Sequence, residues 1–126
     1  MKTVTVLLAD DHRIVAEGLK RLLEPEFELI GVVEDGRALL AAARKLQPDV
    51  IVSDISMPEL NGVEALEELK KVNPATRVVF LTMHHNVAYA RQAMAAGALG
   101  YVLKHSAAEE LILAVRIERE LSKQEI

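Results

Sequence analysis

The sequence predicts an α/β domain: a doubly wound, five-stranded parallel sheet whose strands alternate with five helices. Three observations support this fold class. Short apolar runs alternate with segments of helical period, which is typical of βαβ units. The runs are almost continuously apolar, as in strands buried on both faces. Finally, 126 residues with 51% hydrophobic side chains are enough for one domain with its own core.

Each strand is expected where an apolar run stands between polar or turn-forming residues. The expected strands are, in order, Val4–Ala9, Glu28–Val33, Val50–Ser53, Arg77–Leu81 and Gly100–Leu103.

The helices are expected between these strands, where apolar residues recur at spacings of three and four. Their core stripes are Val15, Leu19 and Leu22; Leu39, Ala43 and Leu46; Val63, Leu66 and Leu69; Ala90, Ala93, Met94 and Gly97; and Ala108, Leu111, Ile112 and Val115. Asp35 is a candidate cap for the second helix, and Ser106 with Glu109 matches a capping box for the fifth. Gly97 is expected to end the fourth helix in a left-handed conformation.

Composition limits the functions that this stretch can have. Aromatic residues make up 3%, which leaves no stacking platform for bases, and a net charge of −4 argues against direct nucleic-acid binding. The chain has no cysteine, so thiolate metal sites and thiol catalysis are excluded. It shows neither a signal-peptide pattern nor an apolar run of membrane-spanning length. We therefore expect a cytoplasmic domain that does not contact a membrane.

Polar residues directly follow four of the expected strands. Asp10 and Asp11 follow the first, Asp54 the third, Thr82 the fourth and Lys104 the fifth. The carboxyl ends of parallel strands meet at one edge of the sheet, where ligands of doubly wound folds bind. Taken one at a time, these residues could be helix caps, turn residues or solvated side chains. Together they predict a site for a divalent metal and a phosphoryl group.

The residue types suggest the chemistry. Crowded carboxylates repel one another, and Mg²⁺, a hard cation that prefers oxygen ligands, would relieve that repulsion. An aspartate can act as a nucleophile toward phosphorus. Lys104 and Thr82 can bind the oxygens of an incoming phosphoryl group.

The combination resembles the receiver domain of bacterial two-component response regulators, which has a flavodoxin-like fold. The resemblance rests on Asp10-Asp11, the segment from Asp54 to Gly62, Leu81-Thr82, and the segment from Tyr101 to Lys104. It covers essentially the whole chain. The segments Val15–Leu19 and Leu81–His84 resemble the branch whose output domain is a LuxR-type helix-turn-helix (NarL/FixJ-like).

The resemblance implies roles for matching positions. Asp54 would accept the phosphoryl group. Asp11, Asp54 and the backbone carbonyl of Ser56 would bind Mg²⁺, for which Mn²⁺ could substitute, and Asp10 would act through water. Thr82 and Lys104 would bind the phosphoryl group. Thr82 and Tyr101 would transmit the conformational change to the output face.

The resemblance also implies partners. A sensor histidine kinase would be the phosphoryl donor, and a C-terminal DNA-binding domain absent from this chain would be the output. Residues 1–121 would form the receiver domain and 122–126 the beginning of a linker. The domain would be no enzyme beyond assisting its own phosphorylation and dephosphorylation. A stand-alone receiver is the other arrangement that the sequence allows.

A second apolar row, formed by Leu113, Ile117 and Leu121, lies opposite the core stripe of the fifth helix. Neighbouring loops or a frayed helix end could explain it. The alternative is a partner face, such as one for a homodimer that forms on phosphorylation.

Two positions depart from the family pattern. His105 stands where many receivers have proline, which leaves the isomer of the Lys104–His105 bond open. Met83 stands where a small residue is common. Histidines 12, 84, 85 and 105 also fall near this edge. A zinc site among them is conceivable, but solvated loop histidines are the simpler interpretation.

Three alternatives remain open at this point. The first is a Mg²⁺-dependent phosphatase with an aspartate nucleophile, although Ser56 stands where such enzymes usually have a second aspartate. The second is a flavin-binding domain, which would need a hydroxyl- and glycine-rich loop where this chain has Asp10-Asp11-His12. The third is a receiver-like binding module that works without phosphorylation.

Overall fold

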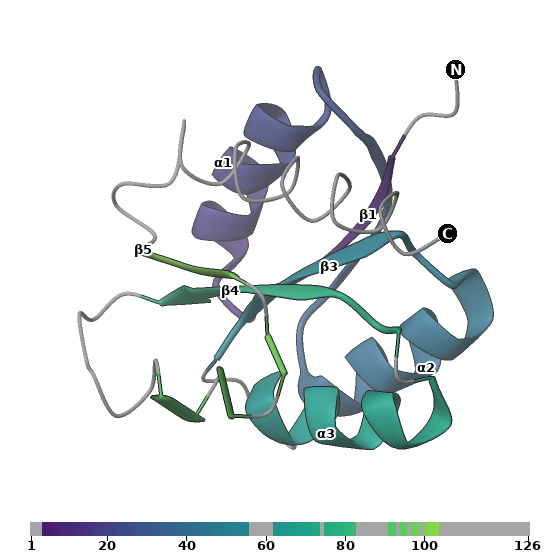
Figure 1. Cartoon of the computed structure of the whole chain (residues 1–126). Helices are drawn as coiled ribbons and strands as arrows, with labels where there is room; N and C mark the ends of the chain where they lie inside the picture. The colour runs from purple at the N-terminus through teal and green to yellow at the C-terminus, as the bar shows by residue number, and fades with distance from the viewer. Residues whose placement is uncertain are drawn as a thin grey trace.

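The computed structural model describes residues 4–55, 62–73, 75–82, 91–92, 94–95, 97–98 and 100–103. Its centre is a parallel sheet of five strands in the order β2-β1-β3-β4-β5 (Figure 1). The strands are β1 Thr5–Ala9, β2 Glu28–Val33, β3 Val50–Asp54, β4 Val78–Thr82 and β5 Gly100–Leu103. Each expected strand is therefore present, with bounds that differ by at most one residue at either end.

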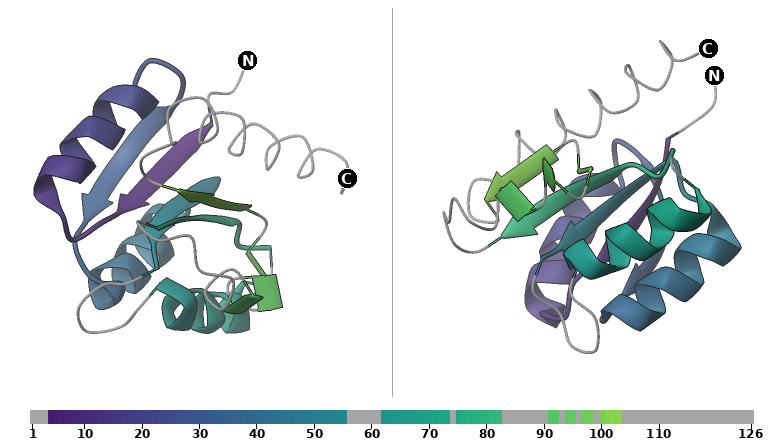
Figure 2. Two further views of the ribbon diagram at one scale, coloured as in Figure 1. Left: turned by 90° about the vertical axis from the view of Figure 1, so that its left-hand side faces the viewer. Right: turned by 60° about the horizontal axis from the view of Figure 1, so that its bottom comes forward.

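The described helices are α1 Arg13–Leu23, α2 Gly36–Leu46 and α3 Gly62–Val72. Helix α1 covers one face of the sheet, and α2 and α3 lie side by side on the other (Figures 1 and 2). This confirms the doubly wound α/β class. The fourth expected helix lies partly, and the fifth wholly, outside the described residues, although residues 91, 92, 94 and 95 are helical.

Alternate residues of the buried strands supply two separate cores, as the period of a strand requires. Toward α1, the strands contribute Val6, Leu8, Val50, Val52, Val79 and Leu81, which pack with Ala16, Leu19, Leu23 and Phe27. Toward α2 and α3 they contribute Leu7, Ala9, Ile51, Val78 and Phe80, which pack with Leu39, Ala43, Val63, Leu66 and Leu69. All of these side chains are aliphatic except two phenylalanines, in line with the aromatic-poor composition.

Two expectations about burial were wrong. The sequence suggested that every strand is buried on both faces, but β2 is an edge strand that is mostly half-buried. Leu46, expected in the core stripe of the second helix, is 41% exposed because it lies in the last turn of α2. Its neighbours Leu39 and Ala43 are buried as expected.

The ends of the helices follow local chemistry. Asp35 caps α2 as predicted, since its Oδ1 accepts a hydrogen bond of 2.7 Å from the backbone of Ala38. Gly97 has φ +98°, the left-handed conformation expected at a helix end, and its N–H donates to the carbonyl of Met94. Gln47 ends α2 in the same region, with φ 48°, which the sequence did not indicate.

The strand order places a topological switch point between β1 and β3. The chain leaves β1 through α1 toward β2 on one side, whereas β3 and the following strands lie on the other. Register pairs Ala9 with Ser53, so Asp10 and Asp54 lie beside each other just past that pair. A ligand site is expected at this edge. None of the described helices is long and apolar enough to cross a bilayer.

Candidate metal centre

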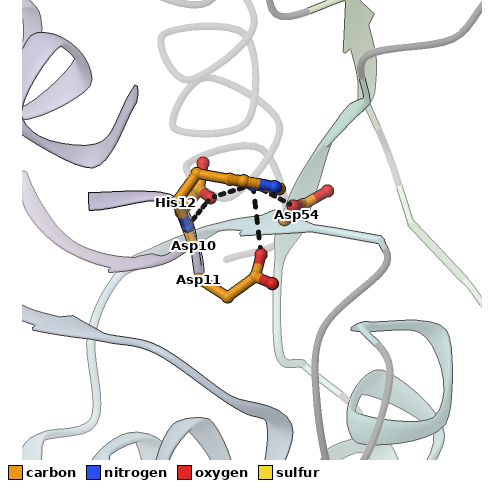
Figure 3. A group of neighbouring side chains, drawn as sticks. All are labelled: Asp10, Asp11, His12 and Asp54. Atoms are coloured by element: carbon orange, nitrogen blue, oxygen red, sulfur yellow. Dashed lines mark hydrogen bonds and ion pairs between the residues drawn. The ribbon is translucent and has the colours of Figure 1, made fainter. Parts of the chain in front are cut away.

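Three carboxylates and one imidazole meet at the carboxyl ends of β1 and β3 (Figure 3). Asp10, Asp11, His12 and Asp54 each offer one ligand atom, and these atoms all lie within 4.8 Å of one another. Asp10 is 1% and Asp54 4% exposed. The sequence predicted the three aspartates, and the structure brings them together.

Asp10 is held by the backbone on both sides. Its N–H donates to the carbonyl of Val33 at 2.9 Å, which continues the pairing of β1 with β2. Its Oδ1 accepts a hydrogen bond of 2.9 Å from the backbone N–H of His12. Helix α1 begins after His12, which caps it without a side-chain hydrogen bond. A conventional capping role for the aspartate pair is therefore not what the structure shows.

Asp54 is fixed by the strands around it. The hydroxyl of fully buried Ser53 donates to the backbone carbonyl of Asp54 at 2.9 Å. The next amide, that of Ile55, donates to the carbonyl of Leu81 on β4 at 3.2 Å. The peptide that follows Asp54 is thus tied from both of its ends, which limits the positions that the carboxylate can take.

His12 was the member of the cluster that sequence analysis did not assign. Its Nδ1 lies 3.2 Å from Asp10 Oδ1, 3.2 Å from Asp11 Oδ1 and 3.7 Å from Asp54 Oδ2 (Figure 3). As expected of a loop histidine, its side chain is 57% exposed to solvent, and its Nδ1 also faces the three carboxylates. The only signal in the sequence was its place directly after the two aspartates.

The donor set fits a hard divalent cation. Three carboxylates so close together are mutually repulsive, and a cation with oxygen ligands relieves that repulsion. Oδ1 of Asp11 is a buried oxygen without a hydrogen-bond partner among the described residues. Such an oxygen is available to coordinate a cation. The geometry and the chemistry of the cluster therefore suit Mg²⁺.

The structure covers the other expected site residues only in part. The backbone of Thr82 ends β4 and is paired with Leu103, and Tyr101 is paired with Phe80. The register thus puts Thr82 at the same edge as Asp54, which is level with Leu81. The side chains of Thr82 and Tyr101 are not described. Ser56, Lys104, Leu113, Ile117 and Leu121 lie outside the described residues, as do His84, His85 and His105.

Fold and site together define an α/β domain with an acidic metal centre at its switch point. A model of the response regulator receiver domain matches residues 6–116. This chain belongs to the family of response regulator receiver domains, a regulatory domain of two-component signalling. The assignment confirms the resemblance and supports it over the phosphatase and flavin-binding alternatives.

Relatives and solved structures agree with this assignment. The chain is 40% identical over 116 residues to the transcriptional regulatory protein DegU of Brevibacillus brevis, a match that covers 90% of this chain and 49% of DegU. It thus spans about half the length of the curated relatives that it matches.

Among solved structures, a LuxR-family two-component response regulator from Aurantimonas sp. SI85-9A1 is 36% identical with a TM-score of 0.87, over 92% of this chain and 84% of that chain. The isolated REC domain of RcsB from Salmonella enterica serovar Typhimurium, solved in the presence of phosphomimetic BeF3⁻, is 31% identical with a TM-score of 0.75. That match covers 82% of this chain and 79% of the other.

Proposed function

We propose that Asp54 accepts a phosphoryl group from a sensor histidine kinase and thereby switches this receiver domain between two states. One observation carries the proposal: the carboxylate of Asp54, 4% exposed, shares a single cluster with those of Asp10 and Asp11 at the switch point of the fold. Burial beside two other carboxylates makes the chemistry of Asp54 dependent on a cation.

The carboxylates of Asp11 and Asp54 would hold the cation together with the backbone carbonyl of Ser56, and Asp10 would act through water. Mg²⁺ is the ion that this oxygen set suits, and Mn²⁺ is a substitute. When bound, the cation neutralises charge on the phosphoryl oxygens and on the attacking carboxylate. Ser56 is assigned by its position in the sequence, two residues after Asp54.

The transfer is a displacement at phosphorus. A carboxylate oxygen of Asp54 forms the new P–O bond while the P–N bond of the phosphohistidine breaks, and the departing imidazole nitrogen keeps the electron pair. The Thr82 hydroxyl and the Lys104 ammonium would bind the remaining phosphoryl oxygens. Small acyl phosphates such as acetyl phosphate could serve as donors by the same displacement. Hydrolysis of the acyl phosphate would reset the domain.

Phosphorylation would shift an equilibrium between two pre-existing conformations. Thr82 on β4 and Tyr101 on β5 are the residues that we propose link the site to the output face. The pairing of these two strands, Phe80 with Tyr101 and Thr82 with Leu103, supports that route. A homodimer through the row formed by Leu113, Ile117 and Leu121 is one form that the output could take.

The wider context is also proposed. The relatives are transcriptional regulators about twice as long as this chain, which supports a C-terminal DNA-binding domain in the natural protein. Residues 1–121 would then be the receiver and residues 122–126 the beginning of a linker, and DNA contacts would belong to the other domain. We place the protein in the cytoplasm, where a kinase and DNA are both accessible.

A phosphoryl mimic tests the site without a kinase. RcsB has been solved with BeF3⁻, and the same reagent with Mg²⁺ should bind at Asp54 here. We expect a rise in Tm and shifted amide NMR signals near the ends of β1, β3 and β4, because a ligand that binds the folded state stabilises it. Asp54→Asn should abolish the response, and Glu17→Gln, an exposed acid on α1, should leave it intact. An equal response in Asp54→Asn would contradict the proposal.

A further inference from the structure

The imidazole of His12 faces all three carboxylates of the candidate metal centre. Its Nδ1 lies 3.2 Å from Asp10 Oδ1 and 3.2 Å from Asp11 Oδ1, and 3.7 Å from Asp54 Oδ2. The ring comes from the residue that precedes α1, so its position is set by the same turn that positions Asp10 and Asp11 (Figure 3).

Hydrogen bonding alone does not account for this arrangement. Nδ1 carries at most one hydrogen, and the ring satisfies hydrogen-bond geometry with Asp10 Oδ1. Asp11 Oδ1 lies equally close to Nδ1 but has no hydrogen-bond partner within the described part of the chain. Nδ1 therefore lies close to more carboxylate oxygens than the number to which it can donate a hydrogen bond.

Two of the three distances are close to those between ligands of one ion. Metal–ligand bonds of about 2.0–2.1 Å put neighbouring ligands about 3.0 Å apart in an octahedral shell and about 3.3 Å apart in a tetrahedral one. The separations of 3.2 Å from Nδ1 to Asp10 Oδ1 and to Asp11 Oδ1 lie near these values, and the 3.7 Å to Asp54 Oδ2 is longer than either. An ion bound by Nδ1 together with the carboxylates of Asp11 and Asp54 would replace the hydrogen bond of Nδ1 and satisfy Asp11 Oδ1 as well.

We propose that His12 Nδ1 is a ligand of the proposed cation site and gives the site a preference for borderline divalent ions, of which Zn²⁺ and Co²⁺ are the probes. The inference rests on the proposed function, because it concerns the same carboxylates. Mg²⁺ prefers oxygen ligands, whereas Zn²⁺ and Co²⁺ accept imidazole nitrogen readily. The side chain is 57% exposed, so solvent can accept the hydrogen that Nε2 carries when Nδ1 binds metal.

The test compares metal affinities by calorimetry for the chain and two histidine variants. Zn²⁺ generally binds more tightly than Mg²⁺ at nitrogen and oxygen sites, so the informative quantity is the part of the preference that depends on His12. In His12→Asn we expect the ratio of the Mg²⁺ Kd to the Zn²⁺ Kd to fall at least about tenfold. His85→Asn removes another histidine that the sequence places near this edge, and it should change that ratio less. The visible spectrum of the Co²⁺-loaded chain should also change in His12→Asn, because a nitrogen ligand is lost.

The outcomes separate this inference from the proposed function. If Asp54→Asn abolishes Mg²⁺ binding but His12→Asn leaves the ratio and the Co²⁺ spectrum unchanged, the site is real and His12 is not a ligand. If the chain binds Mg²⁺ and Asp54→Asn binds it equally well, the proposed site and the inference both fail. If the ratio of the Mg²⁺ Kd to the Zn²⁺ Kd falls in His12→Asn and not in the control variant, His12 is supported as a ligand.

Discussion

Two nitrogen atoms of His12 lie against one carboxylate oxygen of Asp10. The backbone nitrogen is 2.9 Å from Asp10 Oδ1, and the ring Nδ1 is 3.2 Å from the same atom. The first contact is an Asx-type turn, in which an aspartate accepts a hydrogen bond from the amide two residues later. This turn directs the chain from β1 into α1 and, in doing so, places the imidazole at the acidic cluster.

The crowding of the carboxylates predicts an unusual effect on stability. Asp11→Asn removes one negative charge from a cluster whose ligand atoms lie within 4.8 Å of one another. Without metal we expect the variant to be more stable than the parent by about 1 kcal/mol, a rise in Tm of about 4 °C, because like-charge repulsion is relieved. Adding Mg²⁺ should raise the Tm of Asp11→Asn by less than it raises the Tm of the parent, because the variant has lost one ligand of the cation.

Thermal unfolding in chelator and in Mg²⁺ measures both effects. Glu17→Gln, which removes an exposed acid from the middle of α1, is the control and should change neither Tm by more than about 1 °C. A metal-free Tm for Asp11→Asn below that of the parent would show that repulsion does not dominate at this cluster.

Ser53 predicts a link between the core and the phosphoacceptor. Ser53→Ala deletes the 2.9 Å hydrogen bond to the carbonyl of Asp54 from a fully buried position. We expect a loss of about 1 kcal/mol in the free energy of unfolding, measured in urea. We also expect weaker Mg²⁺ binding, since the peptide that orients the Asp54 carboxylate is less constrained. Unchanged Mg²⁺ affinity in a destabilised variant would confine Ser53 to a structural role.

The cap of α2 gives a prediction with a conservative control. Asp35→Ala removes the acceptor of the 2.7 Å hydrogen bond from Ala38 and should lower the free energy of unfolding by about 1 kcal/mol. Asp35→Ser keeps a capping oxygen and should recover most of that loss. If both variants lose equal stability, the carboxylate acts through its charge rather than through the cap.

Two glycines predict opposite effects of the same substitution. Gly97 has φ +98°, and a Cβ there would lie 2.8 Å from the side-chain nitrogen of Lys70, so Gly97→Ala should destabilise the domain by about 1–3 kcal/mol. Gly18 lies inside α1, and a Cβ there meets no atom of the described chain within 4 Å. Gly18→Ala should therefore stabilise the domain by about 0.5–1 kcal/mol.

Denaturant unfolding of the two variants side by side checks this prediction. Destabilisation of similar size in both would mean that the helical glycine has a packing role that the structure does not show. A neutral Gly97→Ala would mean that the backbone and Lys70 adjust without cost.

The sequence was sufficient to predict the sheet and the three aspartates because both depend on simple patterns. Apolar runs of strand length end in polar residues, and parallel strands end at a common edge, so Asp10, Asp11 and Asp54 converge provided that their strands are neighbours, as β1 and β3 are. The same reasoning predicted the Asp35 cap and the left-handed Gly97. In each case the residue type itself carries the conformational preference.

Features that depend on the tertiary arrangement were not predictable in this way. The partial exposure of β2 follows from its place at the edge of the sheet, which apolar character alone does not reveal. The left-handed Gln47 closes the C-terminal end of α2, and no glycine stands there to signal that conformation. The direction of the His12 ring goes with its contacts to carboxylates at the ends of two different strands.

The central claim is that Asp54 accepts a phosphoryl group with the help of a cation in the carboxylate cluster. Its most direct test is the intact mass of the chain after incubation with acetyl phosphate, with and without Mg²⁺, beside Asp54→Ala. We predict a gain of one phosphoryl group that requires Mg²⁺ and is absent from the variant. A gain of the same size in Asp54→Ala, or one that is independent of metal, would contradict the claim.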